Sequence, residues 1–211
     1  MSKRVICISR TLASGGEEIG CLVAQRLGFR YVDDEIVVTA AKKVKVNPKL
    51  VEQAEHKQAI LDRVLDWLGQ SVEIPTPGDK GDHGPPNFVP EDFRALIRAV
   101  VYETGRKGDV VILAHAASMA LGFMEGVLRV FVTASPETRV MRLSRIGRMS
   151  EKGAMKALKD SEEARRDYIK RFYQIEEELP THYDLLINTD TLTAEQAAHI
   201  IVSAARGSEQ H

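Results

Sequence analysis

The feature that most constrains the fold is the first strand-like segment together with the turn that follows it. The segment from Arg4 to Ile8 is short, mostly apolar and bounded by charge, as is typical of a strand buried on both faces of a parallel sheet. Turn-forming residues occupy 11–16. From Glu17 the apolar residues recur at helical spacing as far as Gly28, a residue type that commonly ends helices. The sequence therefore predicts a strand, a glycine-rich turn and a helix in direct succession.

The same alternation continues along the chain. A short segment at 29–32 leads to a helix expected up to about Val44, and another helix is expected from Pro48 to about Leu68. The helical spacing of apolar residues then restarts at Phe93. Further strands are expected at 110–113, 128–132 and 183–188, and further helices at 136–146, 150–178 and 197–205. Strands and helices in alternation predict an α/β fold, a doubly wound parallel sheet in three layers whose ligand site lies beyond the carboxyl ends of the strands.

One segment interrupts this pattern. Residues 71–90 hold five of the eight prolines and three glycines, so neither a helix nor a central strand can persist there. A long loop of this kind is either a surface insertion or a functional segment. We expect a single domain over residues 1–211 that carries this insertion loop, because 211 residues suit one domain of ordinary size.

Composition excludes several classes of protein. The 29 basic and 30 acidic residues give a net charge of -1, which argues against bulk nucleic-acid binding. Cys7 and Cys21 have no Cys or His neighbours at ligand spacing, which argues against a disulfide framework and a zinc site. The first residues are too weakly apolar for a signal peptide, and no apolar run reaches the length of a membrane span. We therefore expect a soluble cytoplasmic protein that does not bind membranes.

The turn after the first strand is the strongest candidate for a binding site. Glycines between a strand and a helix let backbone N–H groups approach phosphate oxygens, and the helix N-terminus adds partial positive charge. The predicted phosphate-binding residues are Ala13, Ser14, Gly15, Gly16, Glu17 and Glu18. A plain connection between strand and helix is the alternative. Against the nucleotide-binding pattern G-x-x-x-x-G-K-[ST], Gly16 stands at the lysine and Glu17 at the Ser/Thr.

Four blocks of sequence resemble the cytidylate kinase-like proteins of the P-loop nucleoside monophosphate kinase group. The family's first loop reads I-S-R-x-x-G-S-G-G-x-x-I-G, and residues 8–20 match it except that Ala13 replaces a glycine. Residues 27–36 resemble L-G-x-x-Y-x-D-x-E-[IL]. Residues 130–142 resemble V-F-[IV]-x-A-x-x-x-x-R-x-x-R, and residues 183–189 resemble Y-D-L-x-[IL]-N-T. The resemblance implies a P-loop kinase fold with a five-stranded parallel sheet, helices on both faces and a helical lid at about 145–171.

The resemblance also implies a function. Its members transfer a phosphoryl group from ATP, with Mg2+, to a nucleoside monophosphate or a similar small acceptor. In many relatives a basic residue follows the paired glycines, where this chain has Glu17, and a glycine-supported arginine stands where it has His115. An aspartate of the predicted lid is replaced by Glu162. The loop thus resembles a phosphate cradle that lacks its own cation.

Phosphoryl transfer needs positive charge around the transferred group, and arginines elsewhere in the chain would have to supply it. Arg10 directly follows the first strand. Arginines also recur every third residue from Arg139 to Arg148, which places them along one face of a helix. The predicted catalytic residues are Arg10, Arg142, Arg148 and Arg165. Solvated arginines paired with neighbouring glutamates are the alternative.

Asp33 and His115 are the predicted acceptor-binding residues. The resemblance places Asp33 after a short strand beside the acceptor, where it would hold a sugar or base or orient a Mg2+-bound water; a helix N-cap is the alternative. His115 ends a predicted strand, where a structural hydrogen bond is the alternative to nucleotide contact. The sequence does not identify metal ligands.

Three functions fit this sequence. The first is a cytidylate kinase-like enzyme with a degenerate phosphate loop, and the second is a nucleotide-binding regulatory protein that has lost turnover. The third is an interaction module in which the helix from Pro48 to Leu68 and the proline-rich loop bind a partner. The apolar face of that helix, which includes Trp67, suits either the core or a homodimer surface.

Overall fold

The computed structural model describes residues 3–33, 90–113, 116–122 and 124–207. The chain divides into two compact units, one made of residues 1–33 and 101–211 and the other of residues 34–100. Of the second unit the structure describes residues 90–100, which form the first part of helix α5 (Pro90–Lys107). The helices expected within 34–68, the loop at 71–90 and His115 lie outside the described residues. The single-domain organisation stays a prediction.

The first unit is built on a five-stranded parallel sheet, as predicted. Its strands are β1 (Val5–Arg10), β2 (Arg30–Val32), β3 (Val110–Leu113), β4 (Val127–Thr133) and β5 (Leu185–Asn188). Their order across the sheet is β2-β3-β1-β4-β5, with every pair parallel. Because β1 is central, the turn that follows it emerges between the carboxyl ends of β3 and β4.

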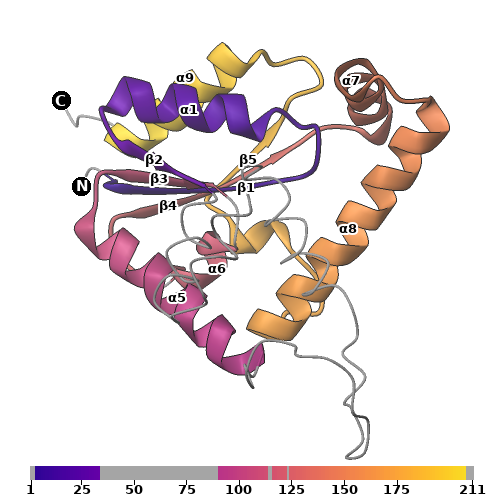
Figure 1. The fold of residues 1–211 in the computed structure, drawn as a ribbon. Helices are drawn as coiled ribbons and strands as arrows, with labels where there is room; N and C mark the ends of the chain where they lie inside the picture. Colours follow the sequence, from indigo (N-terminus) through magenta and orange to yellow (C-terminus); the bar gives the residue numbers. More distant parts are fainter. Residues whose placement is uncertain (1–2, 34–89, 114–115, 123, 208–211) are drawn as a thin grey trace, which may run out of the picture. The chain divides into compact units, whose positions relative to one another are not determined.

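Helices cover both faces of this sheet (Figure 1). α1 (Gly16–Leu27) and α9 (Ala194–Arg206) lie on one face, and α6 (Ala117–Ala120) lies on the other. The core between the sheet and the α1/α9 layer contains Ile8, Ile19 and Ile201, each at most 1% exposed. A strand covered on both faces has to be apolar throughout, which explains the uninterrupted apolar run in β1.

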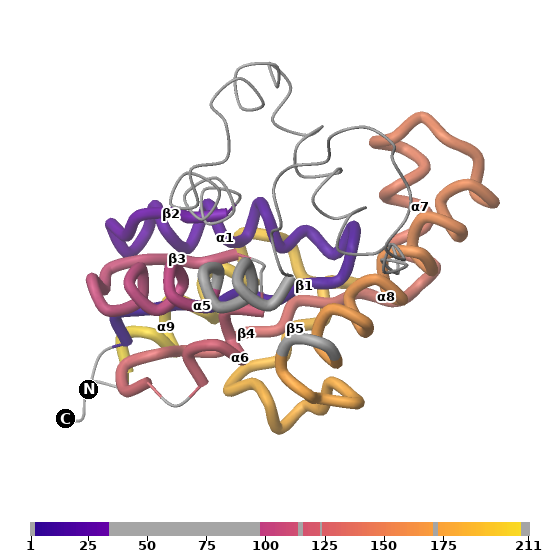
Figure 2. The backbone as a smooth tube through the Cα atoms, turned by 60° about the horizontal axis from the view of Figure 1, so that its bottom comes forward, coloured from indigo at the N-terminus to yellow at the C-terminus, as the bar shows by residue number. Residues whose placement is uncertain are grey.

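Two further helices, joined by a short connection, form a hairpin beside the sheet. α7 (Pro136–Gly147) and α8 (Glu151–Tyr173) pack against each other and extend from the side of the sheet at which β1 ends (Figures 1 and 2). α7 begins as predicted at Pro136, where the Ser135 side chain accepts a hydrogen bond from the Thr138 N–H. None of the described helices is both long and apolar enough to cross a membrane.

The helix predicted to run to residue 178 is five residues too long. α8 ends at Tyr173 because Gln174 adopts a left-handed conformation (φ 58°) and turns the chain out of the helix. Residues 180–182 then form a short 3-10 helix, η1 (Pro180–His182), before β5. The other boundaries in the first unit agree closely with the sequence, including the end of α1 at Gly28, whose φ is 68°.

The two cysteines differ sharply in exposure, which gives a direct test of this core. Cys7 is completely buried in β1, and this burial raises the pKa of its thiol to about 12, whereas Cys21 is exposed on α1. We expect iodoacetamide at pH 8 to add one group to the folded protein, at Cys21, and two in 8 M urea, as measured by mass spectrometry. Folded Cys21→Ser should give no adduct. Alkylation of Cys7 in the folded state would show that β1 is not central.

Candidate phosphate-binding site

The glycine-rich loop (residues 11–15) is held to the sheet by its own buried groups. Ser14 is 0% exposed, and its backbone N–H and its hydroxyl both donate to the Thr11 carbonyl, at 3.2 and 2.8 Å. The Thr11 N–H donates to the Val132 carbonyl of β4 at 3.1 Å. Ala13 and Gly15 both have left-handed backbones, with φ of 63° and 85°. The loop therefore has a fixed shape that requires two such residues within three positions.

The N-terminus of α1 opens at the end of this loop. Gly15 is the N-cap residue, and no described side chain caps the helix. The first N–H groups of a helix have no partner within it, so those of Gly15, Gly16, Glu17 and Glu18 need partners from outside the helix; Gly16 itself is buried. All four belong to the predicted phosphate-binding set. Ser14 was also predicted to bind phosphate, but its N–H already donates to the Thr11 carbonyl within the loop.

Arg10 lies across the start of α1. A Cβ atom added at Gly16 would fall 2.8 Å from both Cβ and Cδ of Arg10, so the arginine stem occupies the space of a side chain there. The Arg10 guanidinium forms an ion pair with Glu17, with Nη2 and Oε1 2.7 Å apart. Its buried Nε finds no hydrogen-bond partner among the described residues. The predicted cation is thus at the loop, but a carboxylate in the first turn of α1 neutralises it.

Arg142 reaches the loop from α7 but contacts carbonyl groups. Its Nη1 donates to the Thr189 hydroxyl at 2.9 Å and lies 3.4 and 3.5 Å from the carbonyl oxygens of Ser14 and Ala13. Its Nη2 donates to the Thr189 carbonyl at 2.6 Å. Thr189 was not predicted as a site residue. The only sequence signal for it was its place at the end of the Y-D-L-x-[IL]-N-T block.

Arg165 is engaged by an acidic side chain that follows α8. Its Nε and Nη2 donate to the two carboxylate oxygens of Glu178 at 2.9 and 2.6 Å, a bidentate pair. Its guanidinium also lies 5.6 Å from the centre of the Phe131 ring, which stacks on Tyr183. These contacts fit a structural arginine that ties α8 to the sheet.

The other predicted lid arginines differ in environment. Arg148 is exposed at the C-terminus of α7, with φ 47°. Arg139 is 5% exposed and donates to Glu162 at 2.6 Å, while its Nε and Nη1 have no partner among the described residues. Of the four predicted catalytic arginines, the structure thus brings Arg10 and Arg142 to the loop, whereas Arg165 is paired with Glu178 and Arg148 is exposed.

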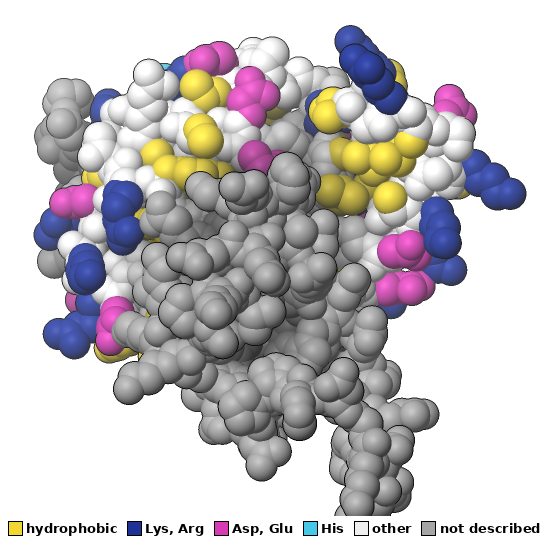
Figure 3. Space-filling model, viewed as in Figure 1, with side chains coloured by type: hydrophobic (Ala, Val, Ile, Leu, Met, Phe, Trp, Pro, Cys, Tyr) yellow, Lys and Arg dark blue, Asp and Glu magenta, His cyan; other side chains and the backbone are white. Residues whose placement is uncertain are grey.

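Both basic and acidic side chains lie on the exposed side of α8 (Figure 3). An ion pair there joins Lys159 to Glu163 at 3.8 Å. Lys170 also pairs with Glu176, at 2.7 Å. Pairs of this kind are solvated and contribute little to stability. This face of the predicted lid is a solvent-facing surface.

Asp33 directly follows β2 and is partly buried. Burial raises the pKa of the Tyr31 hydroxyl, and the negative charges of nearby Asp33 and Glu17 raise it further. Two carboxylates therefore act on the same phenol beside the start of α1. The described residues contain no cluster of three or more groups that could hold a metal ion by themselves.

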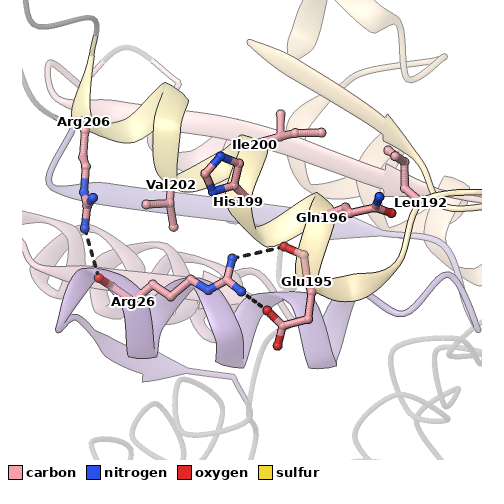
Figure 4. A pocket seen from close by; sticks show the side chains of 8 residues that line it. All are labelled: Arg26, Leu192, Glu195, Gln196, His199, Ile200, Val202 and Arg206. Carbon is pink, nitrogen blue, oxygen red and sulfur yellow. Dashed lines mark hydrogen bonds and ion pairs between the residues drawn. The ribbon is translucent and has the colours of Figure 1, made fainter.

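A cavity lies between α1 and α9, with a volume of about 750 Å³ (Figure 4). Arg26 is an obvious anion ligand there, but it is paired with the Glu195 carboxylate and donates to the Glu195 carbonyl at 3.1 Å. Arg206 donates to the Arg26 carbonyl at 3.3 Å. Apolar Leu192 and Ile200 complete the lining. This groove contains none of the predicted site residues, and its cations are already engaged.

The sheet order β2-β3-β1-β4-β5, the helices on both faces and the glycine-rich loop after the central strand define an α/β fold of the P-loop kinase type. The chain belongs to the cytidylate kinase-like family, whose sequence model matches residues 5–191. It is therefore a kinase-type protein. No curated protein sequence matches the chain.

Solved structures support the fold. An uncharacterized protein from Eubacterium ventriosum superposes with a TM-score of 0.68 and 15% identity over 95% of this chain and 97% of that one. Shikimate kinase from Bacteroides thetaiotaomicron gives 0.52 and 13%, over 95% and 96% of the two chains. A protein from Thermus thermophilus gives 0.51 and 16%, over 98% and 100%. At such identities the likeness shows the fold alone.

Asp190 links the end of β5 to the start of α7 and makes the site region sensitive to acid. Its Oδ1 accepts from the Ser135 N–H at 2.8 Å, the main reason that the pKa of its carboxyl falls from 3.8 to about 2. Because the pKa of the Asp190 carboxyl is lower in the folded state than in the unfolded state, the ionised carboxylate stabilises the fold above about pH 4. This contribution disappears as the pH falls towards 2 and the carboxylate becomes protonated. We expect Asp190→Asn to lower the urea midpoint at pH 7 and to match the wild type near pH 2.

The exposed Asp160 of α8 provides the control. Asp160→Asn should leave the urea midpoint unchanged at both pH values. A difference between Asp190→Asn and the wild type that persists at pH 2 would mean that the carboxylate charge is not what holds Ser135.

Proposed function

We propose that the protein transfers the γ-phosphoryl group of ATP to a nucleoside monophosphate or a similar small phosphorylated or hydroxylated acceptor. The observation that carries this proposal is the row of uncapped N–H groups from Gly15 to Glu18 at the carboxyl end of the central strand. Backbone donors at a helix N-terminus are suited to phosphate oxygens. Membership of the cytidylate kinase-like family supports ATP as the donor.

The reaction requires positioning and charge neutralisation. An acceptor oxygen forms a bond to the γ-phosphorus while the bond to the β,γ-bridging oxygen breaks, and ADP leaves without a covalent enzyme intermediate. The N–H groups of Gly15 and Gly16 would hold phosphate oxygens. Arg10 is the cation placed to stabilise charge that develops on the transferred group. Asp33, on the acceptor side, would orient the acceptor or take up the proton of a hydroxyl.

Mg2+ is implied by the family, and the residues present fit an ion that arrives with the nucleotide. Mg2+ at phosphate sites keeps several waters and needs only one or two protein carboxylates, of which Asp33 would provide one. When bound, the ion would neutralise charge on the phosphates.

A regulatory protein that binds nucleotide without turnover is the second candidate. This candidate is favoured because the arginines near the site already have partners within the protein. Arg10 is paired with Glu17, Arg165 with Glu178, and Arg142 with carbonyl groups. Turnover would then be slow because little net positive charge faces the transferred phosphoryl group. Measured turnover separates this candidate from the first.

The ion pair between Arg10 and Glu17 predicts opposite effects of two substitutions. Glu17→Gln should strengthen ATP binding about tenfold, because it frees Arg10 and removes a negative charge near the triphosphate. Arg10→Ala should lower kcat/KM by about two to three orders of magnitude. Calorimetric titration with ATP and Mg2+, and assays with CMP, dCMP, UMP and AMP, measure both effects.

The double variant shows whether the two residues act through each other. In the Arg10→Ala background, Glu17→Gln should gain much less affinity than in the wild type. Glu125→Gln and Arg106→Ala, which change exposed charges outside the site, are the matched controls. Brisk turnover in Arg10→Ala would show that another group supplies the charge. ATP binding without turnover in any variant would favour the regulatory candidate.

We further propose that residues 145–171 act as a lid. The basis is the hairpin geometry of α7 and α8 beside the loop, together with the exposed arginine at 148. Hydrogen exchange should slow across this segment at saturating ATP and Mg2+, while α9 keeps its exchange rate. Unchanged exchange at 145–171 would remove the lid from the mechanism and leave the phosphate site intact.

A further inference from the structure

A buried hydroxyl lies directly against the glycine-rich loop. Thr189, at the end of β5, is 3% exposed, and its Oγ1 donates to the Ser14 carbonyl at 2.7 Å. The same oxygen accepts from Arg142 Nη1 at 2.9 Å, and the Thr189 N–H donates to the Thr133 carbonyl of β4 at 2.8 Å. Thr189 thus connects four segments: the loop, α7, β4 and β5.

The Ser14 carbonyl belongs to the peptide group that also carries the Gly15 N–H. In a trans peptide the C=O and the N–H point in opposite directions. A Ser14 carbonyl held towards the buried Thr189 hydroxyl therefore directs the Gly15 N–H away from the interior, towards the open end of α1. The left-handed backbone of Gly15 (φ 85°) continues the chain from this peptide into the helix.

Arg142 adds positive charge on the carbonyl side of the same peptides. Its Nη1 lies 3.4 Å from the Ser14 oxygen, and its position is fixed by the 2.6 Å bond from Nη2 to the Thr189 carbonyl. A cation beside a carbonyl polarises the peptide group, and the N–H at the other end becomes a stronger donor. Glu17 neutralises the positive charge of Arg10, and Arg142 partly replaces that charge from the carbonyl side of the loop.

We propose that Thr189 and Arg142 are positioning residues that aim and polarise the Gly15 N–H for a phosphate oxygen. This inference rests on the proposed function, because it concerns the same loop. It assigns a role to Thr189 and gives Arg142 a role other than the direct phosphate contact expected from the sequence. Phosphate affinity then depends on a hydroxyl that does not touch the ligand.

Two substitutions at one position test this role. Thr189→Val keeps the shape of the side chain and removes the hydroxyl, whereas Thr189→Ser keeps the hydroxyl. We expect Thr189→Val to weaken binding of ATP and of inorganic tripolyphosphate about tenfold, and Thr189→Ser to stay within about twofold of the wild type. Thr191→Val, in the exposed part of the same connection, is the control and should leave both affinities unchanged.

The amide resonance of Gly15 separates positioning from a purely structural role. In 15N-labelled full-length protein, tripolyphosphate should shift the Gly15 amide proton downfield in the wild type and in Thr189→Ser, but much less in Thr189→Val. A structural role alone would lower the urea midpoint of Thr189→Val while its affinity and its Gly15 shift stayed as in the wild type. That result would overturn the inference.

Arg142→Lys keeps the inference testable if Thr189→Val does not fold. Lysine retains the positive charge but has a single nitrogen. It cannot bond the Thr189 carbonyl with one nitrogen and approach the Ser14 carbonyl with another, as Arg142 does. Wild-type affinity together with a wild-type Gly15 shift in Arg142→Lys would overturn the inference. If the wild type binds ATP but does not turn over, only the proposed reaction fails; if it binds neither ATP nor tripolyphosphate, both proposals fail.

Discussion

The hydrogen bonds of the Ser14 backbone are the constraint on which the rest of the site depends. Ser14 is completely buried, and a buried peptide group without partners would cost free energy comparable to a lost hydrogen bond. Its N–H finds the Thr11 carbonyl within the loop, and its carbonyl finds Thr189 and Arg142 from two distant parts of the chain. The shape of the loop is therefore coupled to the positions of α7 and of the end of β5.

The general fold could be predicted from sequence because it follows from local patterns. The continuous apolar run in β1 reports burial on both faces, and Gly28 and Pro136 mark helix ends through their own backbone preferences. The end of α8 could not be predicted in this way. Gln174 has no intrinsic preference for the left-handed conformation that ends the helix there, so tertiary packing decides this boundary.

The candidate site was predictable in position but not in its contacts. A strand, glycines and a helix in succession predicted where the N-terminus of α1 lies, because these are features of neighbouring residues. The partners of Arg142 depend on segments far apart in the chain, since it contacts both Ser14 and Thr189. Helical spacing predicted one arginine face, whereas packing directs Arg139 to Glu162 and Arg142 to Thr189.

The glycine at position 16 follows from the same packing. The Cβ and Cδ atoms of Arg10 occupy the space into which any side chain at Gly16 would project, at 2.8 Å. An overlap with the first atoms of a side chain cannot be relieved by rotating its far end. A lysine at position 16 and an arginine stem at position 10 in this conformation therefore exclude each other. The cation beside the loop is therefore Arg10, at the end of β1, where the carboxylate of Glu17 reaches it. In the proposed site a phosphate would have to compete with that carboxylate for Arg10, so nucleotide binding would be coupled to release of an acidic side chain at the start of α1.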